Sequence, residues 1–270
     1  MPKPKASELP ERKAAARLLE AHEQRERFAP LPADLAPKTA EQAYAIQDAF
    51  LALRSDRLGP IAGYKIALSS AEMQRFVGVT TPQAGAILRS QVRRTPARVR
   101  ASDYVRLIVE FEVGVEMGDD LPAADAPFDR ERVLQAVAAV MPAIEIADDR
   151  DADYSQLSRH PYELIADNCW NEGAVLGEPV REWRSLDLGQ VLGVATLNGR
   201  KVGEGRGEAA MGHPLDAVAW VANHLASRNR GLLRGEMVIT GSLITSKAVK
   251  AGDRVEFDLR GLGKAELVVE

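Results

Sequence analysis

The sequence predicts an α+β protein with a mixed, mainly antiparallel sheet system, flanking helices and a helical N-terminal segment. Its strands come as hairpins, and the clearest hairpin turns at Asn198 and Gly199, the strongest two-residue turn signal. Few helical segments separate the strands, whereas a doubly wound parallel sheet needs a helix after nearly every strand. The stretch before residue 59 differs, because its apolar residues repeat at helical spacing.

The composition of the 270-residue chain is that of an ordinary globular protein. Hydrophobic residues make up 46% and charged residues 27%, which argues against a disordered or membrane-embedded chain. The formal charge is −4 and no basic block dominates any region, so we expect no nucleic-acid partner. The N-terminal sequence has no apolar signal region, and no later apolar run is long enough to span a membrane. We therefore expect a cytoplasmic protein without a membrane partner.

The cysteine and histidine content limits the kind of metal site. The single cysteine, Cys169, excludes an internal disulfide, and the four histidines are too scattered for a zinc site. Any metal would therefore be held mainly by oxygen ligands. A general-base role is open for two histidines. However, His213 precedes Pro214 at a helix start, where it is expected to help form the turn, and His160 lies in a predicted loop.

The N-terminal segment, residues 1–58, is predicted to contain two helices. The first runs from Glu8 to about Arg27, and a Pro-rich linker follows it. Thr39 and Gln42 form a capping-box pattern that starts the second helix. We expect residues 59–270 to form a single catalytic domain with a sizeable core.

The predicted elements beyond Gly59 alternate between strands and short helices. In chain order the strands are IAGYKIAL, residues 104–117, PAIEIADD, EGAVLGE, the VATLNGRKV hairpin, residues 254–260 and AELVVE. The helices are AEMQRFV, which ends at Gly78, FDRERVLQAVAAV, which Asp129 caps, and HPLDAVAWVANHLASR, with Pro214 in its first turn. The GEGRGE run at 203–208 follows a hairpin rather than a strand-to-helix turn, so we do not interpret it as a phosphate loop.

The predicted strand LIVEFEVGVEM carries glutamates, which are depleted in strands. Its odd positions are apolar, while Glu110, Glu112 and Glu116 share the other face. Residues two apart on a strand have Cα atoms roughly 6.5–7 Å apart on the same face, so Glu110 and Glu112 can lean toward one ion. Such oxygen-only coordination suits Mg²⁺ or Mn²⁺, and the alternative is a solvated outer face of the sheet.

Glu145 and Lys65 add to this pattern. Glu145 lies between Ile144 and Ile146, where a buried carboxylate without a partner would be costly or would lose its charge. Either a divalent ion or a lysine or arginine partner would offset that cost. Lys65 is the polar position of GYKIAL, and it would either clamp a substrate carboxylate beside a metal or simply face solvent.

Seven segments in collinear order resemble the fumarylacetoacetate hydrolase superfamily, and within it the branch of 2-oxopent-4-enoate (2-hydroxypentadienoate) hydratases and 4-oxalocrotonate decarboxylases. They are GYKIAL, VEFEVGVEMGDDLP, MPAIEIADDR, LIADN, GRGEAAMGHPLDAVAWVANHLA, VITGS and AGDRVEFDLRGLG. The resemblance implies the superfamily's mixed β-roll with flanking helices and a homo-oligomer. It also implies a metal site in which Glu110, Glu112 and Glu145 are the ligands, with Lys65 in the active site.

The resemblance implies a chemistry as well. In this branch a small 2-hydroxy-dienoate, or its 2-oxo tautomer, chelates Mg²⁺ or Mn²⁺ through its C1 carboxylate and C2 oxygen. A hydratase then adds water to give a 4-hydroxy-2-oxo acid, whereas a decarboxylase reaches the same dienolate by losing carbon dioxide. We rank hydration ahead of decarboxylation, although one set of metal ligands serves both. Another enzyme of the same pathway is an expected partner.

The residues expected around the far end of the substrate depart from the hydratase pattern. Gln83 and Ala84 stand where an acidic and an aromatic residue are usual, and Trp170 in ADNCWN takes the place of a serine. We interpret Gln83 as a neutral hydrogen-bonding catalytic group and Trp170, with Val77, as part of the substrate-binding wall. Asn168 is expected either to have a polar catalytic role or to cap backbone groups, the more ordinary use of an asparagine.

Two further alternatives stay open. One is a carbon–carbon hydrolase of acylpyruvate type, for which His22 and Glu23 on the first helix would be the acid–base pair if that helix covers the site. The other is a catalytically silent homologue that serves as a scaffold or partner subunit. Glu116 lies beyond Gly114 and is expected outside the metal site, as an ordinary exposed charge.

Overall fold

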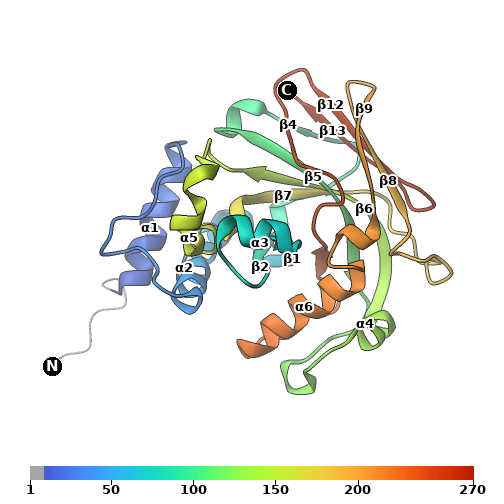
Figure 1. The fold of residues 1–270 in the computed structure, drawn as a ribbon, viewed down its shortest axis with the longest axis horizontal. Coiled ribbons are helices and arrows are strands. Elements are labelled where there is room, and N and C mark those ends of the chain that lie inside the picture. Colours follow the sequence, from blue (N-terminus) through green and yellow to red (C-terminus); the bar gives the residue numbers. More distant parts are fainter. Residues whose placement is uncertain (1–8) are drawn as a thin grey trace.

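The computed structural model describes residues 9–270, so Glu8, where the first predicted helix starts, lies outside the described residues. The chain forms two sheets, and its helices lie to the left of and below the smaller sheet in Figure 1. The helices are α1 Pro10–Glu23, α2 Ala40–Leu58, α3 Ala71–Val77, α4 Arg130–Ala136, α5 Pro161–Ala166 and α6 Pro214–Ser227. Short 3₁₀ turns lie at Arg89–Gln91, Ala101–Asp103, Ala123–Asp125, Tyr154–Arg159, Asn168–Trp170 and Gly207–Ala209. Within the described range, no helix combines the length and apolar character that crossing a membrane requires.

The larger sheet is mixed. Its strands are β1 Ile61–Ala67, β2 Gln83–Leu88, β3 Val92–Arg94, β5 Leu107–Met117, β6 Val137–Asp148, β7 Asn171–Leu176, β10 Met237–Ile239 and β11 Lys247–Ala248. They follow the order β2-β1-β10-β5-β6-β7-β3, and β11 pairs with the start of β5. β1 is parallel to β10 and β3 is parallel to β7, whereas the other pairs are antiparallel.

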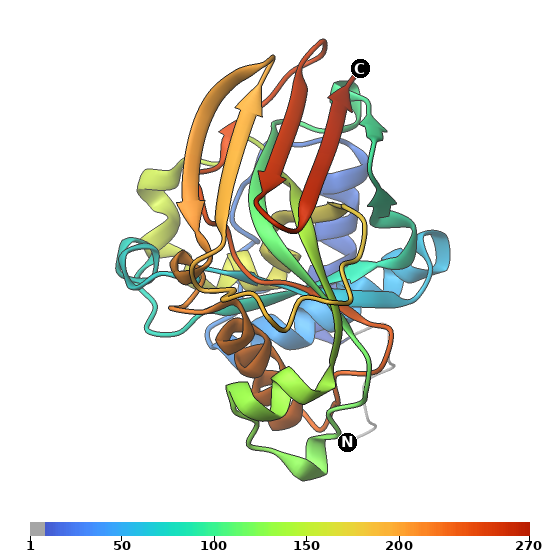
Figure 2. The ribbon, with the colours of Figure 1, turned by 90° about the vertical axis from the view of Figure 1, so that its right-hand side faces the viewer.

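The smaller sheet has the order β4-β13-β12-β8-β9. Its strands are β4 Ala97–Val99, β8 Leu192–Leu197, β9 Arg200–Arg206, β12 Arg254–Leu259 and β13 Gly263–Val269. Only its β4–β13 pair is parallel. Figure 2 shows these strands standing side by side, with the long strands of the larger sheet behind them. The predicted α+β class, with mixed and mainly antiparallel sheets, is confirmed.

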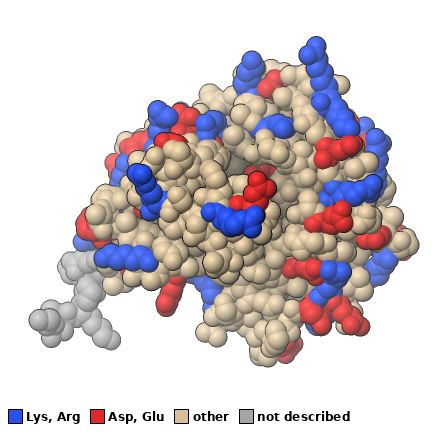
Figure 3. All heavy atoms as spheres, viewed as in Figure 1, with Lys and Arg blue, Asp and Glu red and all other residues tan. Residues whose placement is uncertain are grey.

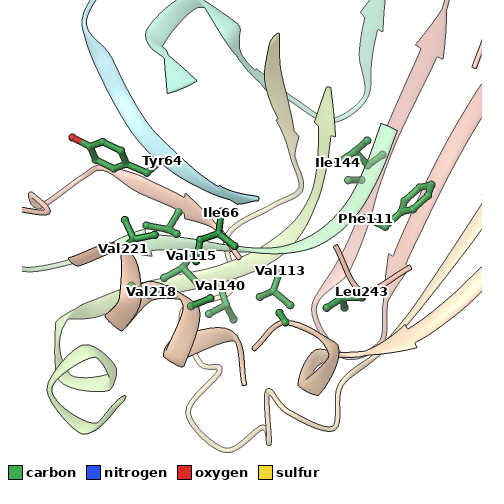
Figure 4. Close-up of a cluster of buried hydrophobic side chains, with 14 of the residues drawn as sticks. Tyr64, Ile66, Phe111, Val113, Val115, Val140, Ile144, Val218, Val221 and Leu243 are labelled. Atoms are coloured by element: carbon green, nitrogen blue, oxygen red, sulfur yellow. The ribbon is translucent and has the colours of Figure 1, made fainter. Parts of the chain in front are cut away.

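The main hydrophobic core lies against one face of β5. Phe111, Val113 and Val115 alternate along this strand, and Figure 4 shows them on the side of Val218 from α6. Phe111 also packs on Phe257 of the smaller sheet, with ring centroids 5.5 Å apart. Since successive residues of a strand point to opposite faces, the glutamates between these positions are directed to the other side.

The N-terminal helices lie at the opposite end of the molecule from the smaller sheet (Figure 1). α1 and α2 pack on each other and on α5 through a separate apolar cluster, which includes Leu18, Phe50 and Ile165. Thr39 starts α2, because its hydroxyl accepts a hydrogen bond from the Gln42 N–H at 3.2 Å. α5 leads directly into the turn at 168–170, so the N-terminal helices support that turn from behind.

Most predicted elements are present. α3 ends at Gly78, which has a φ of +82°, and α6 begins at Pro214. Asn198 and Gly199 connect β8 to β9 as a hairpin. The predicted helix through FDRERVLQAVAAV is wrong in its second half, because α4 ends at Ala136 and residues 137–140 begin β6. These valines and alanines pair with β5, and the sheet pairing outweighs their helical pattern.

Candidate active site

Three carboxylates lie together on the face of the larger sheet that is turned away from α6. Glu110 and Glu112 lie two residues apart on β5, and Glu145 on β6 is directly opposite Glu110 in the register. Opposed residues of an antiparallel pair share a face, so the register brings the three side chains together. One carboxylate oxygen from each lies within 4.8 Å of the others. Glu116 is outside this carboxylate cluster and lies 3.6 Å from Arg181.

One lysine and two hydrogen-bond donors surround the carboxylate cluster. Lys65 Nζ lies 3.0 Å from Glu145 Oε1, to which the Asn171 amide also donates at 2.9 Å. The backbone N–H of Gly241 donates to Glu112 Oε2 at 2.7 Å. The second oxygens of these two glutamates are buried and have no hydrogen-bond partner within residues 9–270. Because an unpaired buried carboxylate oxygen is costly, the arrangement fits a further positive ligand.

The electrostatics of the carboxylate cluster favour a cation. Burial, followed by the charge of Glu145, raises the pKa of Glu110 to about 7 and raises the pKa of Glu112 well above its usual value. Burial alone lowers the pKa of Lys65, but the attraction of Glu145 and the other two carboxylates outweighs it and raises this pKa. A single lysine thus faces three carboxylates, and oxygen donors of this kind fit Mg²⁺ or Mn²⁺.

The loop after β10 aims the N–H of Gly241 at Glu112. Gly241 has a φ of +99°, a conformation that side-chain-bearing residues rarely adopt. An added Cβ would also lie 2.7 Å from Ser69 Oγ. The next residue, Ser242, fastens the loop to β5, because its hydroxyl accepts a hydrogen bond from the Phe111 N–H at 3.0 Å.

The turn at 168–170 has three successive residues in the left-handed region. Asn168, Cys169 and Trp170 have φ values of 50°, 51° and 58°. The Asn168 side chain donates to the Ala86 carbonyl oxygen and accepts from the Ala86 N–H, both at 2.8 Å. Gly85 leaves room for the turn, since a Cβ there would lie 2.7 Å from the Asn168 carbonyl oxygen. The Asn168 amide therefore caps backbone groups of β2.

A buried network of ionisable side chains stands behind this turn, and the sequence did not reveal it. His22 of α1 lies with Nε2 2.6 Å from Asp167 Oδ1 and Nδ1 3.3 Å from Glu172 Oε1. Arg150 pairs with Asp167, and Arg54 forms two bonds with Glu172. Burial by itself lowers the pKa of His22, but the two carboxylates outweigh it and raise this pKa to about 9. The only feature of the sequence that could have pointed to this network is that Asp167 belongs to LIADN, one of the segments that carry the family resemblance.

A cavity of about 520 Å³ opens beside the carboxylate cluster. Four of the predicted site residues line it, namely Lys65, Val77, Glu110 and Trp170. Asp149 and Tyr154 also line this cavity, and neither was singled out from the sequence. Asp149 lies in the ADDR end of a segment that carries the family resemblance, so its position was the only available signal.

Gln83 and Asn168 lie outside that lining. Gln83 Nε2 donates to the Pro161 carbonyl oxygen at 3.2 Å, at the start of α5. Its side chain borders a different hollow of about 910 Å³, which residues of α2, α5 and α6 surround. The structure thus places Lys65, Val77 and Trp170 at the cavity and places Gln83 and Asn168 in the layer behind it.

The histidines weighed from the sequence lie outside the cavity lining as well. His213 Nδ1 accepts a hydrogen bond from the Leu215 N–H at 3.1 Å and so caps α6. His160 precedes the first residue of α5 without a side-chain cap bond. His22 faces its two carboxylates, whereas Glu23 is exposed.

The fold and the site together define a class of protein in which a curled mixed sheet carries a cluster of three carboxylates that could hold a divalent cation. Residues 66–270 match the family model described as fumarylacetoacetate (FAA) hydrolase C-terminal, so the chain belongs to that family. The resemblance noted from the sequence is thereby confirmed.

Curated relatives and a solved structure extend this result. The chain is 33% identical to a 2-keto-4-pentenoate hydratase of Paraburkholderia xenovorans, over 95% of this chain and 94% of the relative. It is 31% identical to a 2-hydroxyhexa-2,4-dienoate hydratase of Comamonas testosteroni, over 93% of this chain and 94% of the relative. A 4-oxalocrotonate decarboxylase from Pseudomonas putida, complexed with magnesium and adipate, superposes with a TM-score of 0.88 at 25% identity, over 96% of this chain and 97% of that one.

Proposed function

We propose that the chain is a divalent-metal-dependent carbon–oxygen lyase. It adds water to a small 2-hydroxy-dienoate, through its 2-oxo tautomer, to give a 4-hydroxy-2-oxo acid. The observation that carries the proposal is the buried cluster of Glu110, Glu112 and Glu145 beside Lys65 and a cavity. The names of the two hydratase relatives support the type of reaction.

We assign the metal to the three glutamates of the carboxylate cluster. The unpartnered oxygens of Glu112 and Glu145, within the described chain, support direct ligation. Mg²⁺ or Mn²⁺ bound there supplies a Lewis acid for the C2 oxygen and C1 carboxylate of the substrate. The magnesium in the solved decarboxylase supports a hard divalent ion.

The chain's own residues bind and orient the substrate in this proposal. Lys65 Nζ, which lies 3.0 Å from Glu145 and 3.5 Å from the Cys169 carbonyl oxygen, places a positive charge in the lining of the cavity. That charge attracts the substrate carboxylate. Val77 and Trp170 form part of the wall that lines the cavity around the distal carbons of the substrate.

Gln83 and Asn168 act from behind the wall. Gln83 holds the start of α5 through the Pro161 carbonyl, and Asn168 holds the turn at 168–170 against β2. Both keep Trp170 at a fixed place beside the substrate, so their contribution is positional. Gln83 and Trp170 replace residues that are usual in the hydratases. In this proposal the two replacements change the shape of the cavity wall rather than the catalytic groups.

The test is the loss of dienol absorbance when the purified protein is incubated with 2-hydroxypenta-2,4-dienoate and Mg²⁺ or Mn²⁺. We expect metal-dependent turnover by the wild type and none above the metal-only blank by Glu112→Gln. Glu116→Gln is the matched control, because it removes a glutamate from the same strand outside the carboxylate cluster. Wild-type loss no faster than the blank would contradict the hydratase proposal and leave a decarboxylase, a hydrolase or a catalytically silent homologue as the alternatives.

A 4-oxalocrotonate-type decarboxylase is the second candidate, because the solved decarboxylase superposes along nearly the whole chain. Release of carbon dioxide from 4-oxalocrotonate, measured beside hydration of the dienoate, separates the two reactions. An acylpyruvate-type hydrolase has less support, since His22 is occupied by Asp167 and Glu172 and does not line the cavity.

We also propose that the protein works in the cytoplasm as a homo-oligomer, beside a partner enzyme of the same pathway. We keep the division into a helical segment 1–58 and a catalytic domain 59–270 as part of the proposal. A mass of 29.4 kDa by light scattering on the eluted protein would contradict the homo-oligomer.

A further inference from the structure

One side of the cavity is lined by apolar side chains. Its apolar wall consists of Met73, Val77, Leu157, Leu164 and Trp170. All of them except Met73 pack together in one buried cluster. The indole N–H of Trp170 is buried and has no hydrogen-bond partner in the described part of the chain, so the cavity meets only carbon atoms of that ring.

Aromatic contacts fix the position of this wall. The Trp170 ring makes edge contacts with Phe28, at 5.4 Å between centroids, and with Tyr154, at 5.9 Å. Phe28 lies after α1, so a residue of the N-terminal segment supports the wall from outside. The wall is therefore held in shape before any substrate binds.

The charges around the cavity are mainly negative. Glu72, Glu110 and Asp149 line it, and Lys65 is the single cation among the lining residues that the structure describes. Lys65 is paired with a glutamate of the carboxylate cluster. The nearby Arg106 does not line the cavity and donates to Asp149 and to a second aspartate. A carboxylate placed at the apolar wall would thus meet no free cation among these groups.

The cavity is also larger than a five-carbon acid requires. Its volume of about 520 Å³ lies in the range of sites that hold drug-sized ligands, about 300–1,000 Å³.

Figure 3 shows that the molecular face over α3, which supplies Met73 and Val77, is largely uncharged around a few charged side chains.

We infer that the cavity selects 2-oxo or 2-hydroxy acids with a single carboxylate and a large alkyl or aryl tail, and that it discriminates against dicarboxylates. The inference rests on the proposed function, since the C1 and C2 end must be held at the carboxylate cluster. An apolar tail gains by burial against the wall. A second carboxylate loses water there, gains no cation and meets the like charge of Glu72, whereas Asp149 is already paired with Arg106. The selection argues against 4-oxalocrotonate, a dicarboxylate, as the substrate.

Calorimetric titration of the Mn²⁺-loaded protein with three 2-oxo acids tests the inference. Pyruvate reports on the chelating end alone, while 2-oxo-4-phenylbutanoate adds an aryl tail and 2-oxoadipate adds a distal carboxylate. We expect the aryl compound to bind at least about tenfold more tightly than pyruvate, because the phenyl group is buried. We expect 2-oxoadipate to bind no more tightly than pyruvate.

The possible failures are distinguishable. The inference is overturned if 2-oxoadipate binds as tightly as 2-oxo-4-phenylbutanoate, or if the aryl compound binds no better than pyruvate. In either case Mn²⁺-dependent pyruvate binding would leave the proposed function standing. Failure of all three acids to bind in the presence of Mn²⁺ would overturn the proposed function and this inference with it.

A pair of variants at Met73 tests where the tail lies. Met73 is 39% exposed on α3, so the fold can accommodate a longer polar side chain there. Met73→Arg adds a cation to the apolar wall, and Met73→Gln adds a polar group without charge. We expect the affinity of 2-oxoadipate relative to 2-oxo-4-phenylbutanoate to rise at least about tenfold in Met73→Arg and to change less than about threefold in Met73→Gln. An unchanged ratio in a folded Met73→Arg protein would contradict the placement of the tail.

Discussion

Glu145 is a buried carboxylate whose two oxygens differ in their hydrogen-bond partners. Lys65 and Asn171 satisfy Oε1, while Oε2 has no hydrogen-bond partner among the residues described. A lysine partner and a metal ligand were alternatives from the sequence, and here the two roles are compatible because they use different oxygens. The sequence could single out Glu110 and Glu112 by their spacing. It could not reveal that Glu145 stands opposite Glu110, because that depends on the register of two strands.

Asn168 offers a prediction at the residue scale. Asn168→Ala removes both hydrogen bonds to Ala86 and places alanine at a φ of 50°. We expect a loss of about 2–4 kcal/mol in the free energy of unfolding, measured by urea titration, because a buried N–H and C=O lose their partners and the backbone is strained. Asn168→Gly separates the two effects, since glycine tolerates the φ, and it should lose about 1 kcal/mol less. A change below about 0.5 kcal/mol in Asn168→Ala would contradict a capping role.

The elements that the sequence predicted best carry their own boundary signals. Asp129 accepts a hydrogen bond from the Arg132 N–H and starts α4, and Gly78 ends α3. The end of α4 carries no such signal, because the alanines and valines after Gln135 suit a helix and a strand alike. β2 was missed for a similar reason, since QAGAIL is a short apolar run interrupted by Gly85. Pairing with β1 decides its structure, and pairing is not a local property.

The attachment of α1 was equally hidden from the sequence. His22 and Asp167 are 145 positions apart, and no local pattern connects them. In the structure their contact ties α1 to the residue that precedes the turn at 168–170. α1 is therefore a support for the cavity wall rather than a cover over the site.

The His22 contact predicts a pH dependence of stability. The pKa of His22 is raised from 6.5 to about 9 in the folded protein, so its charge stabilises the fold fully below pH 6.5 and the contribution is lost as the pH rises through about 9. His22→Gln keeps an amide donor but has no titratable charge. We expect wild type to exceed this variant by on the order of 1–3 kcal/mol at pH 6 and by little at pH 10, from urea unfolding at both values.

The control for this measurement is His160→Gln. It removes another histidine, for which the described residues contain no ion pair, so it reports what the loss of an imidazole costs without the carboxylate partners of His22. A stability difference between wild type and His22→Gln that is the same at pH 6 and pH 10 would show that His22 acts through packing alone.

At the scale of the whole molecule, one strand joins two environments. The odd residues of β5 belong to the core shared with α6 and the smaller sheet, and the even ones carry the carboxylate cluster. Alternation made this division predictable from the sequence. The strand order β1-β10-β5 could not be predicted from the sequence, although this order brings Lys65 close to the glutamates. It joins strands that are distant in the chain, and β10 is only three residues long.

Because the carboxylate cluster spans strands of the central sheet, metal removal should affect the stability of the entire fold. An ion that binds only the folded state increases the free energy of unfolding by RT ln(1 + [L]/Kd). This increase is about 2.7 kcal/mol when the ion concentration is a hundredfold above Kd. We therefore expect Mg²⁺ or Mn²⁺ to raise the Tm of EDTA-treated wild type by about 5–10 °C in a thermal scan.

Glu112→Gln should abolish that rise and should melt, without metal, at or above the metal-free wild type. The reason is that the substitution removes one of three clustered like charges from a fully buried position while it keeps an acceptor for the Gly241 N–H. Glu116→Gln, on the same strand, should retain the full metal-dependent rise. If metal-free Glu112→Gln instead melted many degrees lower, the carboxylate would be a structural partner of the loop after β10, and the cluster would lose its assignment as a metal site.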